Sequence, residues 1–245
     1  MSDQHIASAY DRDLEGVQAR IMKMGGLVEQ AILDASQALE DRDEEMAEKV
    51  RAGDRVIDEL EELIQEEAAR IIALRQPAAG DLRIVLSILK IAGNLERIGD
   101  YAKNMAKRTS VLVQMQPIAG AHTALRRMAR EVETMLRDAL DAYIQRDAVL
   151  AQDVINRDRD VDQMYNALFR EFLTFMMEDP RNITACMHLH FIAKNTERMG
   201  DHVTSIAEQV VYLVTGAAPE ESRQKGDRTS TDLSVAPTAP LSGEE

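Results

Sequence analysis

Residues 91–106 read IAGNLERIGDYAKNMA, and residues 192–207 read IAKNTERMGDHVTSIA. The two strings share Ile-Ala, Asn, Glu-Arg and Gly-Asp at matching positions, at an offset of 101 residues. Further upstream the offset is 104, so that Asp54 corresponds to Asp158. The difference of three residues fits a shorter connection in the second copy. Self-similarity over so long a period indicates a duplicated structural unit.

Apolar residues recur every seven positions in both copies, which is the pattern of long helices that pack side by side. The second expected helix of the first copy carries Val50, Ile57, Ile64 and Ile71, with Leu60 and Leu74 in the alternate seam. The third expected helix carries Ile84, Ile91, Ile98, Met105 and Leu112. Seams of about 30 residues correspond to helices about 45 Å long. We therefore expect three antiparallel helices in each copy.

Helix-breaking residues fall where this scheme places its turns. Pro77 separates the second and third helices of the first copy, Pro180 does so in the second copy, and Pro117 marks the boundary between copies. Adjacent glycines at Gly25 and Gly26 predict a weak point or kink in the first helix.

The sequence thus predicts an all-α fold of two tandem antiparallel three-helix bundles related by internal duplication. We place the first repeat at 1–116 and the second at 117–215. The remainder, 216–245, is small, polar and proline-containing without apolar periodicity, and we expect a disordered C-terminal tail.

Composition narrows the class of protein. A formal net charge of -14 argues against nucleic acid as a partner, because phosphate repels such a surface. The single cysteine, Cys186, allows no intrachain disulfide, so a reducing compartment is expected. No apolar stretch approaches the ~20 residues that a membrane-spanning helix needs. We expect a cytoplasmic protein without direct membrane insertion.

Both copies place two carboxylates four residues apart, which puts them on one face of a helix. The third helices carry Glu96 and Asp100, and Glu197 and Asp201. The preceding helices repeat the spacing with Asp54 and Asp58, and Asp158 and Asp162. Antiparallel packing would bring four carboxylates together in each copy. The heptad pattern puts none of the eight in an apolar seam, so we expect them on the outer helix face or its edge, in a site that faces the surface.

Four convergent carboxylates repel one another unless a cation lies among them. Oxygen ligands suit Mg, Mn or Fe, and Zn if His202 joins them. The simpler interpretation is a solvated face whose carboxylates pair with Arg97 or Lys103. Duplication of the complete motif favours metal, and both interpretations stay open.

Gly99 and Gly200 lie inside these motifs, although glycine within a helix costs about 1 kcal/mol relative to alanine. Close approach of a neighbouring helix is the favoured explanation. Space for a ligand is the other.

The strings LERIGDYAKNMA (95–106), TERMGDHVTSIAE (196–208) and QPAAGDLRIV (76–85), on a duplicated three-helix unit, resemble the PhoU family over residues 10–215. The resemblance implies a cytoplasmic regulator of the phosphate ABC transporter and a negative regulator of the phosphate-starvation response. It would link the transporter ATPase to a sensor histidine kinase.

Some members of the family bind iron or zinc through a Glu or Asp followed four residues later by Asp. Carried onto this chain, the metal ligands are Asp54, Asp58, Glu96, Asp100, Asp158, Asp162, Glu197 and Asp201. The second copy departs from the family pattern with Ser205 in place of the Asn at 104, and its turn lacks Asp-Leu-Arg. Whether the two sites are equivalent stays open.

Two other classes of function are an iron enzyme and a metal-free scaffold. A carboxylate-bridged di-iron enzyme would use Glu-x-x-His on inward-facing positions, whereas here the residue three after each Glu is Gly99 or Gly200. A metal-free helical scaffold fits the sequence as well. We expect a protein without enzymatic activity and, for so long a helical protein, a homodimer.

Overall fold

A computed structural model describes residues 2–217, which contain six long α-helices, one short 3-10 helix and no strand. The helices are α1 Ser2–Asp41, α2 Glu44–Arg75, α3 Gly80–Leu112, α4 Ala121–Gln145, α5 Ala148–Glu178 and α6 Ile183–Thr215, with the 3-10 turn η1 at Pro180–Asn182. The predicted all-α, duplicated architecture is confirmed. Apart from its first two residues, the predicted disordered tail at 216–245 lies outside the described residues.

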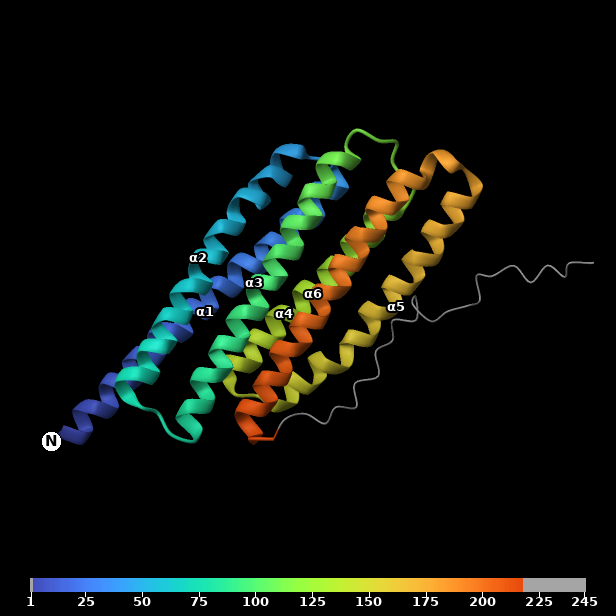
Figure 1. Ribbon diagram of the computed structural model, residues 1–245. Coiled ribbons are helices and arrows are strands. Elements are labelled where there is room, and N and C mark those ends of the chain that lie inside the picture. The colour runs from blue at the N-terminus through green and yellow to red at the C-terminus, as the bar shows by residue number, and fades with distance from the viewer. Residues whose placement is uncertain (1, 218–245) are drawn as a thin grey trace, which may run out of the picture.

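The two three-helix units lie side by side along their full length (Figure 1). Helix α3 of the first unit packs against α6 of the second, and α1 packs against α4. The outer helices α2 and α5 contact only helices of their own unit among the described elements, apart from η1 beside α5. Each unit therefore has an outer seam, between α2 and α3 or between α5 and α6, in which the duplicated carboxylates are found.

Equivalent aspartates begin the middle helix of each unit. Asp43 accepts a hydrogen bond from the backbone N–H of Met46 at 3.0 Å, and Asp147 accepts bonds from Val149 and Leu150. Such side-chain caps satisfy N–H groups that have no partner within the helix. The duplication thus extends to the local signals that start the helices.

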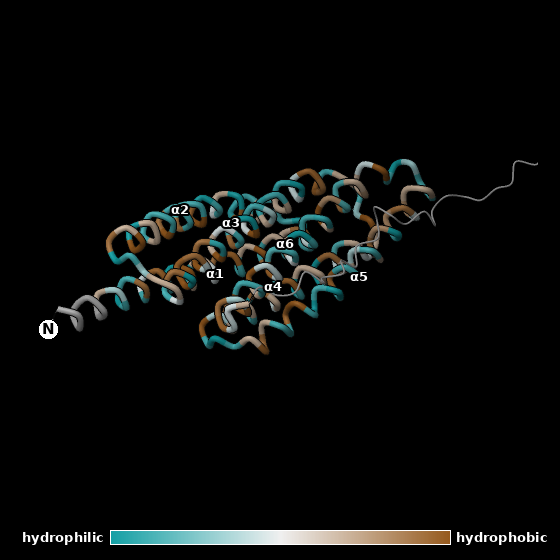
Figure 2. Tube along the Cα trace, turned by 60° about the horizontal axis from the view of Figure 1, so that its bottom comes forward, coloured by the Kyte–Doolittle hydropathy of each residue, from teal (hydrophilic) through white to brown (hydrophobic). Residues whose placement is uncertain are grey.

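The predicted apolar seams form the core. Val50, Ile57, Ile64 and Ile71 of α2 are all buried, as are Ile88, Leu95 and Ala102 of α3. Hydrophobic and hydrophilic stretches alternate along each helix, as expected for amphipathic helices (Figure 2). The placement of Leu74 in a seam was wrong, because its side chain is 65% exposed. A straight helix drifts by about 20° per heptad, which turns this last position away from the core.

Helix α1 runs as one α-helix through Gly25 and Gly26, so the two glycines do not break it. A Cβ on Gly25 would overlap with Cδ1 of Leu140 on α4, whereas a Cβ on Gly26 would meet nothing within 4 Å. Gly25 therefore allows close approach of the two units, and Gly26 lies in open space.

Candidate functional site

The carboxylates of neighbouring helices meet at the motif glycines. A Cβ on Gly99 would lie 3.1 Å from Cδ1 of Ile57 and 3.6 Å from Oδ1 of Asp54. A Cβ on Gly200 would lie 3.3 Å from Oδ1 of Asp158. The predicted close approach is confirmed in both units. The space left by the absent side chain is shared between an apolar neighbour and a carboxylate.

Because of this approach, the prediction that all eight carboxylates face the surface is wrong for half of them. Four are buried, with exposed fractions of 3 to 5%: Asp54, Asp158, Asp162 and Glu197. The other four are half-buried: Asp58, Glu96, Asp100 and Asp201. The heptad pattern describes one helix alone and does not show how far a neighbour covers its flank. A glycine opposite the flank lets that neighbour come close enough to cover it.

In the first unit the four carboxylates are close enough for their charges to raise the pKa values of Asp58 and Glu96. Burial, followed by the charge of Asp54, raises the pKa of Asp58. Burial, followed by the charge of Asp100, raises the pKa of Glu96, to which Asp58 also contributes. Residues of α2 therefore repel residues of α3. We call Asp54, Asp58, Glu96 and Asp100 the first carboxylate cluster.

A lysine lies within this cluster. Lys103 Nζ donates to Oδ1 of Asp100 at 2.7 Å and also to Oδ2 of Asp54. These two hydrogen bonds, to Asp100 and then Asp54, raise the pKa of Lys103 well above its usual range. Arg97 lies 3.4 Å from Glu96 and 3.8 Å from Asp100. The predicted pairing of the carboxylates with Arg97 and Lys103 is confirmed.

The oxygen atoms of the first cluster are only partly available to a metal ion. Asp54 Oδ1 is buried and accepts no hydrogen bond from the described part of the chain, which suits a cation. Yet Lys103 already bridges Asp54 and Asp100. Throughout residues 2–217, no three His, Cys, Asp or Glu side chains are grouped closely enough to hold a metal. A metal would have to displace the ammonium group.

The second carboxylate cluster comprises Asp158, Asp162, Glu197 and Asp201. Thr204 occupies the position equivalent to Lys103. Its hydroxyl donates a hydrogen bond to Oδ1 of Asp158 at 3.3 Å. A lysine is found at the opposite end of the motif, where Lys194 Nζ lies 2.9 Å from Glu197 and 4.9 Å from the centre of the Tyr165 ring. The two clusters share their carboxylates and differ in their cations.

The sequence reasoning missed the roles of Thr204 and Lys194. Both were visible in the duplicated strings, because Lys103 aligns with Thr204 and Gly93 aligns with Lys194. Of the positions that differ between the copies, Ser205 and the turn at Pro180 indicated that the two sites differ, and the same comparison at 194 and 204 would have found both residues.

The junction between the units is built from equivalent positions as well. Tyr101 of α3 and His202 of α6 face each other with ring centres 5.7 Å apart. His202 Nδ1 lies 2.8 Å from the amide oxygen of Asn94. His202 therefore contacts the first unit, so its part in a zinc site is not supported by these contacts.

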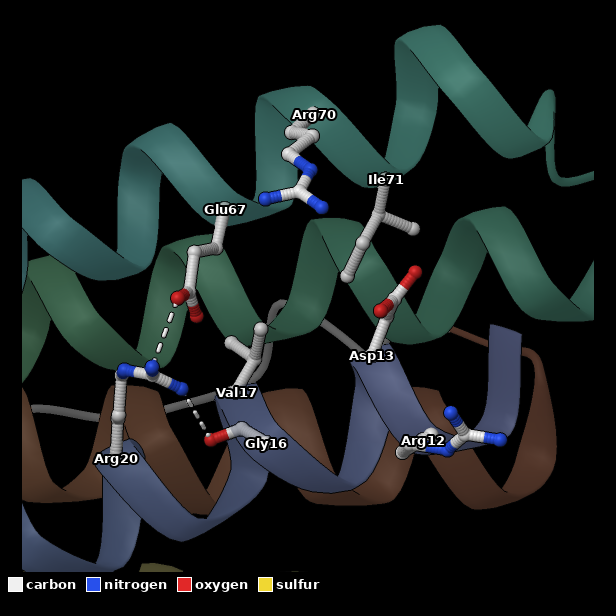
Figure 3. Close-up of a pocket in the computed structure, with 8 residues that line it drawn as sticks. All are labelled: Arg12, Asp13, Gly16, Val17, Arg20, Glu67, Arg70 and Ile71. Atoms are coloured by element: carbon white, nitrogen blue, oxygen red, sulfur yellow. Dashed lines mark hydrogen bonds and ion pairs between the residues drawn. The ribbon is translucent and has the colours of Figure 1, made fainter. Parts of the chain in front are cut away.

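A hollow between α1 and α2 is the other candidate (Figure 3). Three arginines and two carboxylates line it, namely Arg12, Arg20, Arg70, Asp13 and Glu67. Arg20 lies 2.8 Å from Glu67, and Asp13 lies 2.9 Å from Arg75, just beyond the hollow, so the lining carries an excess of positive charge.

Comparison with known proteins now places the chain. Residues 21–109 and 125–210 both match the PhoU domain. The phosphate-specific transport system accessory protein PhoU homolog of Rhizobium meliloti is 45% identical over 96% of this chain and 99% of its own length. The homolog of the same name from Zymomonas mobilis is 47% identical over 90% of this chain and 93% of its own.

Solved structures agree with the sequence relatives. The crystal structure of PhoU from Pseudomonas aeruginosa matches with a TM-score of 0.83 at 42% identity, over 85% of this chain and all of that one. The phosphate transport system regulatory protein PhoU from Streptococcus pneumoniae matches with a TM-score of 0.80 at 31% identity, over 86% and 99% of the two chains. These names describe accessory and regulatory proteins and not enzymes. Because both repeats match and the relatives span nearly the whole chain, this protein belongs to the PhoU family.

Proposed function

We propose that this protein regulates phosphate uptake and represses the phosphate-starvation response. In this role it is a cytoplasmic adaptor between the ATPase of the phosphate ABC transporter and a sensor histidine kinase. The observation that carries the proposal is family membership over both repeats, with relatives named as accessory proteins of phosphate-specific transport. Within residues 2–217, no helix combines the length and apolar content that crossing a bilayer would take.

The regulatory proposal is tested by deleting the gene and measuring phosphate-starvation transcripts in phosphate-rich medium. Expression should stay high in the deletion strain and return to the repressed level on complementation. Normal repression without the gene would refute it. Binding of the purified protein to the ATPase and to the kinase cytoplasmic region, each measured separately by calorimetry, tests the adaptor role.

We also propose that the duplicated carboxylates bind iron or zinc, with magnesium and manganese as further candidates. The repetition of the two-carboxylate spacing on adjacent helices in both units supports this, together with Asp54 Oδ1, which is buried and accepts no hydrogen bond from the described residues. Elemental analysis of protein purified without chelators, compared with an Asp100→Asn, Asp201→Asn double variant, is the test. Equal metal in both proteins would remove the site assignment.

A metal-free scaffold is the second candidate, and the observation that favours it is Lys103, which already bridges two carboxylates. It predicts that the same double variant keeps both its regulation and its metal content unchanged. The proposed homodimer is tested on the same preparations by light scattering coupled to gel filtration, which should give twice the mass of 27.4 kDa.

A further inference from the structure

The hollow between α1 and α2 places cations of both helices around one small space (Figure 3). Its volume is about 210 Å³, which corresponds to about seven water molecules at about 30 Å³ each. Drug-sized ligands occupy larger pockets, of about 300–1,000 Å³. The hollow is therefore suited to a small ion together with some water.

Two arginines that line the hollow lack a partner among the described residues. Arg12 on α1 and Arg70 on α2 are exposed, and neither forms an ion pair or a side-chain hydrogen bond within that part of the chain. Arg20, by contrast, is held by Glu67 at 2.8 Å and by the backbone carbonyl of Gly16 at 2.9 Å. The hollow thus offers a ligand the donors of two guanidinium groups, one from each helix.

The base of the hollow is apolar. Val17 and Ile71 are only 1% and 4% exposed, and both side chains point between the two helices (Figure 3). Gly16 adds no side chain, and a Cβ there would lie 3.4 Å from Nη1 of Arg20. An apolar base keeps water from one side of a bound ion, which strengthens the attraction between that ion and the arginines.

The second copy keeps the glycine and the glutamate of this place but not its arginines. At the offset of 104 residues these two correspond to Gly120 and Glu171, and a Cβ on Gly120 would lie 3.9 Å from Oε1 of Glu171. Two of the arginines correspond to Ala124 and Thr174. The duplicated unit therefore folds without arginines at these positions, and their presence in the first copy needs another explanation.

The lining favours an oxyanion that carries a proton. Arginine binds the oxygens of phosphate with paired N–H groups. Asp13 uses Oδ2 for Arg75, and Glu67 uses Oε1 for Arg20, so each carboxylate has a second oxygen that can accept a hydrogen bond. Hydrogen phosphate can donate its proton to such an oxygen. Sulfate has no proton at neutral pH, so the same carboxylates repel it.

We propose that the hollow binds inorganic phosphate as its hydrogen phosphate ion, with Arg12 and Arg70 as the main ligands. The bound ion then joins α1 to α2. The formal net charge of -14 does not prevent this, because charges farther away than a Debye length of about 8–10 Å are largely screened. The binding itself is independent of the regulatory role proposed above. Its use in sensing the phosphate supply rests on that role.

The experiment titrates the full chain with sodium phosphate at pH 7.5 and constant ionic strength, and follows the arginine side-chain signals by NMR. The dissociation constant should be on the order of 1 mM, because both arginines keep contact with water. Arg12→Gln and Arg70→Gln should each weaken binding about tenfold, and the double variant should abolish it. Arg55→Gln, which removes an exposed arginine of α2 outside the hollow, is the matched control and should bind as the unaltered protein does. All three side chains are exposed, so circular dichroism should show the same helix content in every variant.

Sodium sulfate and glycerol 3-phosphate are titrated in the same way. Both should bind several-fold more weakly than phosphate, because a phosphate monoester with its second pKa near 6 has also lost its proton at pH 7.5. Equal or tighter binding of either anion would overturn the assignment to inorganic phosphate. Absence of a saturable response to phosphate, or equal weakening by Arg55→Gln and Arg70→Gln, would overturn the site.

The sensing role is tested separately in the deletion strain. Complementation with the Arg12→Gln, Arg70→Gln double variant should leave phosphate-starvation transcripts high in phosphate-rich medium. Full repression by this variant would overturn the sensing role and leave the regulatory proposal intact. Normal repression in the deletion strain itself would instead refute the regulatory proposal, whereas the binding titration would still decide the phosphate site.

Discussion

The contact of Gly25 with Leu140 gives the sharpest test of how the two units pack. Gly25 and Gly26 are neighbours in α1, yet a Cβ on Gly25 would overlap with Leu140 and one on Gly26 would meet nothing within 4 Å. Alanine in an open helix position is worth about 0.5–1 kcal/mol relative to glycine. We therefore expect Gly26→Ala to raise the free energy of unfolding by about that amount.

Gly25→Ala should lose this gain. Leu140 is 1% exposed and cannot move into solvent, so the added methyl group overpacks the interface between α1 and α4. Overpacking in a core costs about 1–3 kcal/mol. The two variants should then differ by about 1–3 kcal/mol, which for a protein of this length corresponds to roughly 2–12 °C in melting temperature.

Urea unfolding followed by circular dichroism measures the difference, with the dependence on urea expected to be the same for both variants. A double-mutant cycle then identifies the contact. In a Leu140→Ala background the overlap is removed, so Gly25→Ala should stabilise as Gly26→Ala does. If Gly25→Ala is as stable as Gly26→Ala in the unaltered background, the close packing of α1 on α4 is wrong.

Three further predictions address charge and burial. Burial, followed by the charge of Glu133, raises the pKa of Glu29 in the folded protein, so its carboxylate destabilises the fold as pH rises through that pKa. Glu29→Gln should therefore unfold at a higher urea concentration than the unaltered protein at pH 7. This gain in stability should vanish below the ordinary glutamate pKa of about 4.3. An equal gain at both pH values would contradict the destabilising role of the Glu29 carboxylate. Arg157 on α5 forms ion pairs with two residues of α4, with Glu131 at 2.8 Å and with Asp138 at 2.5 Å. Arg157→Ala should therefore lower the free energy of unfolding by about 1–2 kcal/mol in a urea titration. Arg55→Ala, which removes an exposed arginine, is the control and should change this free energy little. Cys186 is wholly buried, so a thiol reagent should react with it only as fast as the helices open, and rapid labelling in native buffer would refute its burial.

The fold could be predicted because its signals are local and repeated. Seams such as Val50, Ile57 and Ile64 are read from one helix at a time, and each has a counterpart in the other copy. Pro77, Pro117 and Pro180 then indicate where the helices end. The capping roles of Asp43 and Asp147 were found only in the structure. The duplication strengthens the prediction of the fold, because two different sequences carry the same apolar pattern and must form the same packed unit.

The depth of the candidate site could not be read in the same way. Asp54 lies on the flank of its seam, and its burial depends on how closely α3 approaches, which α2 alone does not encode. The glycine at 99 was the available signal, since it predicted a close neighbour without saying which flank that neighbour would cover. The net effect of the cluster also depends on Lys103, whose pairing was predicted but whose reach across to the neighbouring helix was not.

Equivalent positions of the two copies meet where the units pack together. Tyr101 faces His202, and the charge of Glu133 acts on Glu29. Such pairing is what a two-fold relation between the units produces. A substitution at one of these positions therefore acts on both units, because its partner is the equivalent residue of the other copy.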